Sequence, residues 1–188
     1  MPLVKGGRII EDSYQRLLDD APVPERVTVI VPAARLLADA ADLARRAGAT
    51  GVLWPNDRRI AELAPYLDRL QLVALVFPKF KDGRAYSQAR QLREQYDFRG
   101  ELRATGEILR DQFMFMQRAG FDSFEVKKDA DARAFAEATR RFSVFYQPTG
   151  DGRATALRAR LARAHQPSPA RRGAGALTHA SPFLKHEG

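Results

Sequence analysis

The hydrophobic positions of the chain fall into short apolar runs separated by longer segments with helical spacing. The runs predict strands at Val27–Val31, Gly51–Trp54, Leu72–Phe77, Glu101–Thr105 and Asp122–Val126. The segments between and after them predict helices at Leu36–Ala47, Asp57–Leu67, Tyr86–Gln95, Glu107–Ala119 and Ala132–Phe142. Leu72–Phe77 is wholly apolar, as is typical of a parallel strand covered on both faces. The alternation therefore predicts successive βα units.

The fold class that follows is α/β, with a mainly parallel sheet. The predicted units are too few for a complete eight-stranded barrel, so an open sheet and a partial barrel both remain possible. The first residues differ, because Leu3-Val4 and Arg8–Ile10 flank two glycines and predict a small hairpin. Val144–Tyr146 is predicted to add an edge strand.

The net charge of +8 is concentrated at the C-terminal end of the chain. Residues 151–188 hold seven Lys/Arg against two Asp/Glu and are rich in Pro and Gly beyond a short basic segment, Ala154–Ala164. We predict a single α/β domain over residues 1–150 and a basic, largely disordered tail over 151–188. Such a tail can be a binding arm or a plain solvated extension. It carries no aromatic interleaving for base stacking, so nucleic acid is not the expected partner.

Several chemistries are excluded by residue types. The chain has no cysteine, and its three histidines all lie in the tail, at 165, 179 and 186. This excludes thiolate catalysis, and in the body it excludes a Ser-His-Asp triad and a His-held metal, so no metal site is predicted. No glycine-rich dinucleotide loop or P-loop is present, and no cofactor is expected. The N-terminus lacks a signal-peptide layout and no apolar run could span a membrane, so a cytoplasmic protein without a membrane partner is expected.

Charged residues gather where the predicted strands end and on the helices that follow. Because the carboxyl ends of parallel strands meet at one edge, we expect these residues to form one binding face for an anion or a partner. The candidates are Lys79, Lys81, Asp82, Arg84, Tyr86, Arg90, Arg103, Asp111 and Arg118. If the five cations among them, Lys79, Lys81, Arg84, Arg103 and Arg118, converge there, their repulsion favours a bound anion.

Two residues are candidates for catalysis. Lys79 stands between apolar Phe77 and Phe80, where desolvation could prepare it for imine formation; the alternative is a lysine that extends into solvent from a strand end. Glu101 shares a strand face with Arg103, so the two could act as acid and anion clamp or form a structural ion pair. The turn Lys81–Arg84 has the same ambiguity, since it could bind an anion or be an ordinary capped turn.

The longest distinctive stretches are Phe77-Pro-Lys-Phe-Lys-Asp-Gly-Arg-Ala-Tyr-Ser-Gln-Ala-Arg-Gln-Leu-Arg93, then Gly100-Glu-Leu-Arg-Ala-Thr-Gly106, Asp111-Gln112 and Arg118-Ala-Gly-Phe-Asp-Ser-Phe-Glu125. Together they resemble the signature of a bacterial conserved family of unknown function. Genes of that family commonly lie beside the haem subunit of assimilatory sulfite reductase, and its members are labelled oxidoreductases involved in sulfite reduction. The resemblance covers about residues 3–147 and leaves the tail outside.

The resemblance implies a role in sulfur assimilation but no established active site. Two functions follow as expectations. The first is an accessory or partner protein of sulfite reduction, whose charged face docks the haem subunit or binds a small oxyanion. The second is an enzyme with a barrel-like site that uses Lys79 or Glu101 on an anionic substrate held by Arg84, Arg103 and Arg118.

Overall fold

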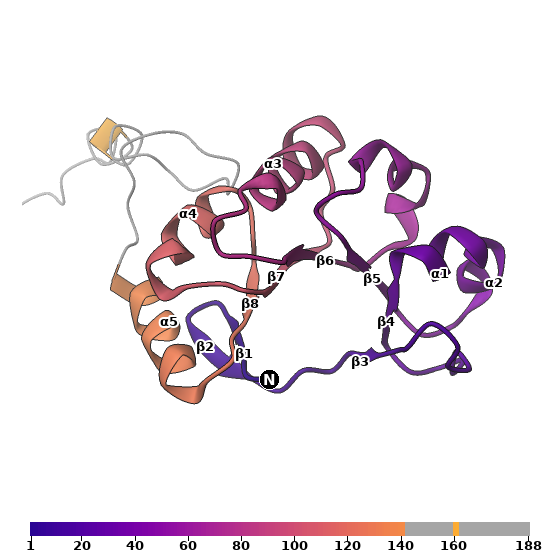
Figure 1. Ribbon diagram of the computed structural model, residues 1–188, viewed down its shortest axis with the longest axis horizontal. Coiled ribbons are helices and arrows are strands. Elements are labelled where there is room, and N and C mark those ends of the chain that lie inside the picture. Colours follow the sequence, from indigo (N-terminus) through magenta and orange to yellow (C-terminus); the bar gives the residue numbers. More distant parts are fainter. Residues whose placement is uncertain (142–159, 162–188) are drawn as a thin grey trace, which may run out of the picture.

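The computed structural model describes residues 1–141 and 160–161, and its centre is one curled sheet of eight strands (Figure 1). The strand order across the sheet is β2-β1-β8-β7-β6-β5-β4-β3. The strands are β1 (Leu3–Lys5), β2 (Arg8–Ile10), β3 (Gln15–Arg16), β4 (Val29–Pro32), β5 (Thr50–Trp54), β6 (Leu72–Phe77), β7 (Glu101–Gly106) and β8 (Ser123–Glu125).

The pairing confirms a mainly parallel sheet. Every neighbouring pair from β3 to β8 is parallel, including β6 and β7, where Leu72 pairs with Glu101. β1 and β2 form the predicted antiparallel hairpin, and β1 joins the sheet antiparallel to β8. Of the two versions that the sequence left open, the partial barrel is the one observed, because the sheet curls into a half-barrel (Figure 1).

Helical segments cover the convex side of the sheet. They are α1 (Ala33–Ala38), α2 (Ala40–Arg45), η1 (Ile60–Glu62), η2 (Ala64–Arg69), α3 (Arg84–Arg90), η3 (Gln91–Gln95), η4 (Arg110–Gln112), α4 (Phe113–Arg118) and α5 (Asp129–Arg141). Their apolar side chains pack against alternate residues of the strands, such as Trp54, Leu75 and Leu102, all fully buried. This layer is the main hydrophobic core.

Several predicted helices are shorter or tighter than the sequence indicated. The segment predicted as Asp57–Leu67 forms two 3-10 helices; Pro65, which has no N–H to donate, lies in the first turn of η2. At the start of η1, the carboxylate of Glu62 accepts the backbone N–H of Arg59 at 3.3 Å. The segment predicted as Leu36–Ala47 is divided at Asp39, whose backbone leaves the helical region.

A segment that the sequence did not predict joins the two edges of the half-barrel. After β2, at one edge, the chain runs through Glu11–Tyr14 beneath the concave face to β3 at the other edge (Figure 1). We call Glu11–Arg16 the strap. β3 pairs with β4 at Arg16 and Ile30, which fixes the far end of the strap to the sheet. The concave face is therefore enclosed between strands and strap.

The predicted edge strand Val144–Tyr146 and almost all of the predicted tail lie outside the described residues. The division into a domain over 1–150 and a tail over 151–188 stays a prediction. In the part of the chain that the structure describes, every helix is too short or too polar to cross a bilayer.

Candidate functional site

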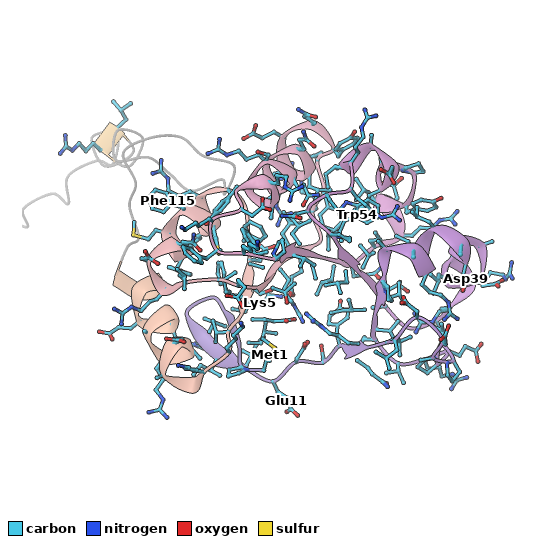
Figure 2. All side chains as sticks on the ribbon, in the orientation of Figure 1. Met1, Lys5, Glu11, Asp39, Trp54 and Phe115 are labelled. Carbon is cyan, nitrogen blue, oxygen red and sulfur yellow. The ribbon has the colours of Figure 1, made fainter. Side chains whose placement is uncertain are left out.

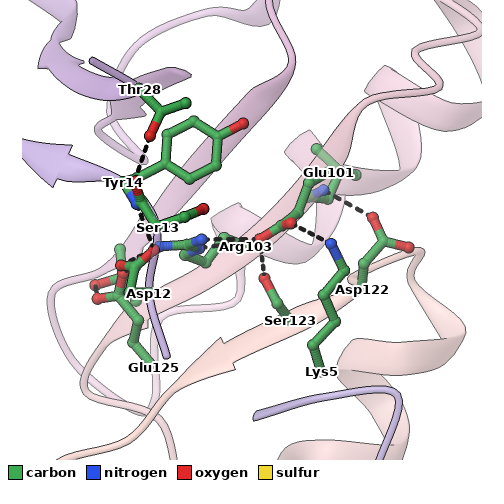
Figure 3. Close-up of polar contacts among 12 residues, drawn as sticks. Lys5, Asp12, Ser13, Tyr14, Thr28, Glu101, Arg103, Asp122, Ser123 and Glu125 are labelled. Carbon is green, nitrogen blue, oxygen red and sulfur yellow. Dashed lines mark hydrogen bonds and ion pairs between the residues drawn. The ribbon is translucent and has the colours of Figure 1, made fainter. Parts of the chain in front are cut away.

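The concave face of the sheet has a buried arginine at its centre. Arg103, in the middle of β7, is only 1% exposed. One terminal nitrogen, Nη1, donates to Asp12 Oδ2 at 2.7 Å and to Glu125 Oε1 at 3.3 Å. Nε and Nη2 donate to Glu101 Oε1 at 3.1 and 3.0 Å. The guanidinium thus contacts a carboxylate from β7, one from β8 and one from the strap (Figure 3).

Strand geometry explains why these groups meet. The two-residue period of β7 puts Glu101, Arg103 and Thr105 on the concave side and turns the residues between them into the core. β8 lies parallel to β7 with Ser123 beside Arg103, which brings Glu125 next to Thr105. The Thr105 hydroxyl donates to Glu125 Oε2 at 2.8 Å.

Further contacts complete the cluster. Lys5 of β1 pairs with Glu101, which also accepts the Ser123 hydroxyl at 2.6 Å. Arg16 of the strap pairs with Glu125 at 2.5 Å. We call this set the concave cluster: it balances the cations Lys5, Arg16 and Arg103 against the carboxylates Asp12, Glu101 and Glu125.

Tyr14 covers the cluster from the strap. Its ring lies 5.5 Å from the guanidinium carbon of Arg103, within cation-π range, and it packs beside Ile30, Leu72 and Ala74 of the concave face. Burial raises the pKa of the Tyr14 phenol, and the negative charge of Glu101 raises it further. The strap therefore stacks an aromatic ring over the arginine and anchors it with Asp12.

The electrostatics of the cluster favour permanent ion pairs. Burial alone would raise the pKa of Glu101, but the hydrogen bonds from Lys5 and Ser123 and the charge of Arg103 outweigh it and lower the pKa. Burial alone would likewise lower the pKa of Arg103, while Asp12 and Glu101 raise it. A carboxylate that stays ionised and is held by three donors is a poor proton donor. The geometry supports the structural ion pair rather than the acid for Glu101.

The loop after β6 places the next candidates at the surface. Lys79, Phe80 and Lys81 are exposed. Asp82 accepts the Arg84 backbone N–H at 3.2 Å and pairs with its guanidinium at 2.7 Å. These hydrogen bonds from Arg84 hold the pKa of the Asp82 carboxyl well below its ordinary value. Lys81–Arg84 thus has the features of a capped turn, in which Arg84 is already engaged.

The helices carry the remaining candidates. Tyr86 of α3 is half-buried and makes an edge-to-face contact with Phe77, with ring centres 5.3 Å apart. Burial, together with the charge of Asp111, raises the pKa of Tyr86 to about 12. Asp111, in η4, and Arg90, the last residue of α3, are both exposed.

The structure does not bring the five cations together. Arg103 projects from the concave face, whereas α4, which ends at Arg118, lies on the convex side (Figure 1). Lys79, Lys81 and Arg84 belong to the surface loop between β6 and α3. The reason is geometric, because Arg103 lies three residues before the end of its strand and its side chain stands across the sheet rather than along it.

Comparison with known proteins shows that the chain matches a protein family. The family described as "Bacterial protein of unknown function (DUF934)" matches residues 51–157. The chain belongs to this family. No curated protein matches it. The region that DUF934 matches runs from β5 onward and includes Glu101, Arg103 and Glu125, while the strap lies before it.

The groups that complete the concave cluster of this DUF934 protein were not among the residues predicted from its sequence. Lys5, Asp12, Tyr14 and Arg16 are about 90 residues or more from their partners on β7 and β8. The one signal available was Arg103 itself, since a charged residue inside a strand needs partners. Within residues 1–141 and 160–161, no group of three or more His, Cys, Asp or Glu side chains is placed to hold a metal ion.

Proposed function

We propose that this protein is an accessory or partner protein of assimilatory sulfite reduction, and that it docks an acidic surface of the haem subunit of sulfite reductase. The link to sulfite reduction rests on the family resemblance. The docking role rests on one structural observation, the exposed basic and apolar surface beyond the carboxyl ends of β6 and β7. We call this surface the docking face and define it as Lys79, Phe80, Lys81, Leu109 and Arg110.

The cations of the docking face are available to a partner. Lys79 and Lys81 are exposed, and neither is paired with a carboxylate within the described ranges. Phe80 between them is 41% exposed, and the Lys81 ammonium lies 5.6 Å from its ring. An exposed aromatic ring flanked by unpaired cations is a suitable anchor for a partner with acidic side chains.

The neighbouring loop extends this surface. The side-chain amide of Gln112 donates to the Phe80 carbonyl at 2.7 Å and accepts the Leu109 backbone N–H at 3.3 Å, so it joins the two loops. Leu109 is 41% exposed and Arg110 is exposed beside it. Farther along, on α4, Phe115 also points outward (Figure 2). Two loops fixed to each other present a more rigid surface than either would alone.

The same lysines are also available to a small oxyanion. Arg103 is committed to three carboxylates and Arg84 to Asp82, so neither offers its guanidinium to sulfite. The enzymatic alternative has less support, because Lys79 is exposed rather than desolvated and Glu101 is held as a carboxylate.

The proposal is tested by affinity capture of the sulfite reductase haem subunit from the cells that make both proteins. The wild-type chain should retain the subunit at low salt. The double variant Lys79→Glu/Lys81→Glu should lose it, because like charges across an interface repel. Lys128→Glu, at an exposed lysine near the start of α5, is the matched control and should behave as wild type. Failure of the wild-type chain to retain the subunit, or equal retention by the double variant, would contradict the proposal.

A further inference from the structure

A cleft of about 430 Å³ opens beyond the carboxyl end of β5. One wall is residues 56–61, a loop that leads into η1, and the other is formed by α3, η3 and the following Tyr96. The volume lies within the range of small-molecule sites, and α/β folds bind their ligands at this edge of the sheet. No residue of the docking face or of the concave cluster lines the cleft.

A buried glutamine fixes the loop wall to the helix wall. Gln88 of α3 is 6% exposed, and its Nε2 donates to the carbonyls of Pro55 at 3.0 Å and Arg58 at 2.9 Å. Because carbonyl oxygens only accept hydrogen bonds, the NH2 group of the amide must face them, and this fixes the orientation of the side-chain amide. Its Oε1 is then left as a buried acceptor with no donor among the described residues. A buried acceptor without a hydrogen bond destabilises the protein, so a ligand in the cleft that donates a hydrogen bond to Oε1 would gain binding energy.

The other wall contains a π-helical turn. The Tyr96 N–H donates to the Gln91 carbonyl at 3.1 Å, five residues back, and Gln91, Gln95 and Tyr96 all line the cleft. In an α-helix, Gln91 and Tyr96 would be about 140° apart around the axis and would face different sides. The wider turn brings them toward one side. Such single turns are frequent at functional sites because they reposition side chains at a cost in helix stability.

The side chains that line the cleft indicate the class of ligand that fits it. Asn56, Gln91 and Gln95 bring amides that both donate and accept, as a heterocyclic base requires. Tyr96 brings an aromatic ring that is 36% exposed, on which a base can stack. The rim holds two arginines, of which Arg58 is paired with Glu62 at 3.0 Å, so Arg59 is the better placed to receive a phosphate.

We propose that this cleft binds a mononucleotide. The base stacks on Tyr96 among the amides, the phosphate is bound by Arg59, and the Asp57 carboxylate on the same rim accepts from the ribose hydroxyls. The chain has no glycine-rich phosphate loop, so recognition is by side chains. This inference is independent of the docking role, since the two sites share no residue.

The test is a titration of the full chain with AMP, followed by amide chemical shifts in NMR. AMP should bind at one saturable site, with the largest shifts in residues 56–61 and 88–96. Arg59→Ala and Tyr96→Ala should each weaken binding about tenfold or more, through loss of a charge-assisted hydrogen bond and of stacking respectively. Arg45→Ala, at an exposed arginine of α2 outside the cleft, is the control and should leave the affinity unchanged.

Adenosine and ribose 5-phosphate separate the two halves of the ligand, and each should bind more weakly than AMP. Both cleft substitutions are at exposed positions, so their spectra should otherwise match wild type and show that the fold is intact. Absence of shifts at millimolar AMP would overturn the proposal. An equal loss of affinity in Arg45→Ala, or equal affinity for ribose 5-phosphate and AMP, would overturn it as well.

Discussion

Replacing Arg103 with methionine removes the central cation of the concave cluster while keeping most of the side-chain volume. It leaves Glu101 and Glu125, both largely buried, without their shared partner at Oε1, since Lys5 and Arg16 contact only the Oε2 atom of each. Removing one member of a buried ion pair typically costs about 3–5 kcal/mol. Because a domain of this size is stable by only about 5–15 kcal/mol, we expect Arg103→Met to lose a large part of its free energy of unfolding.

The measurement is urea unfolding followed by tryptophan fluorescence. The chain has a single tryptophan, Trp54, and it is fully buried in the main core, so its emission reports unfolding of the sheet. The matched control is Arg99→Met, at an exposed arginine that pairs with exposed Asp97. An exposed pair contributes little, so this variant should stay within about 0.5 kcal/mol of wild type.

The cost of Arg103→Met should depend on pH. Since the pKa of Glu101 is lowered in the folded protein, its ionised form stabilises the fold above its ordinary pKa of 4.5, and this contribution is lost as the pH falls through the lowered value. Without Arg103, burial remains and the pKa of Glu101 rises. The difference between variant and wild type should therefore be largest around neutral pH and smaller near about pH 4.

A compensating variant tests whether the unpaired carboxylates cause the loss of stability. Adding Glu101→Gln and Glu125→Gln to Arg103→Met removes the two most buried of the carboxylate charges that it strands, and it should recover at least about 1 kcal/mol. If Arg103→Met unfolds within about 1 kcal/mol of wild type at neutral pH, or if the added substitutions recover nothing, the concave cluster does not stabilise the fold as described.

Two further predictions concern the residues around Phe77. Gly106 ends β7 at φ +100, and a Cβ there would meet the Phe77 carbonyl, so Gly106→Ala should lower the free energy of unfolding in urea by about 1–3 kcal/mol. The control is Gly83→Ala, where a Cβ meets open space, and its free energy of unfolding should stay within about 0.5 kcal/mol of wild type. Equal losses in the two variants would refute this reasoning. Asp111→Asn should lower the pKa of Tyr86 from about 12, since it removes a negative charge near the phenol, and an unchanged ultraviolet titration would contradict that cause.

The strands could be predicted because burial on both faces requires continuous apolar runs. Leu72–Phe77 was predicted with the bounds that the structure shows, and the pattern of β7 correctly placed Glu101 and Arg103 on one face. The helices were harder to predict. A proline in η2 and the π turn in η3 make these segments 3-10 and π helices, although their hydrophobic spacing is that of an α-helix.

Glu101 could be predicted as a partner of Arg103, but the partners on the strap could not, because they depend on the path of the chain. Asp12 and Tyr14 lie in a short polar segment without periodicity, and only the crossing from one sheet edge to the other brings them over β7. The expected convergence of cations failed for a related reason. Sequence order places a residue on a strand or helix, but the side of the sheet that its element covers is set by the curl of the whole sheet.

The most direct test of the central claim is the affinity of the purified sulfite reductase haem subunit for the immobilised chain at several salt concentrations. The docking account predicts binding that weakens as salt rises, because the lysines of the docking face attract acidic side chains through water. It predicts at least about a tenfold loss of affinity, mostly in the association rate, for Lys79→Glu/Lys81→Glu and no loss for Lys128→Glu. Absence of binding at low salt, or equal affinity of all three proteins, would contradict it.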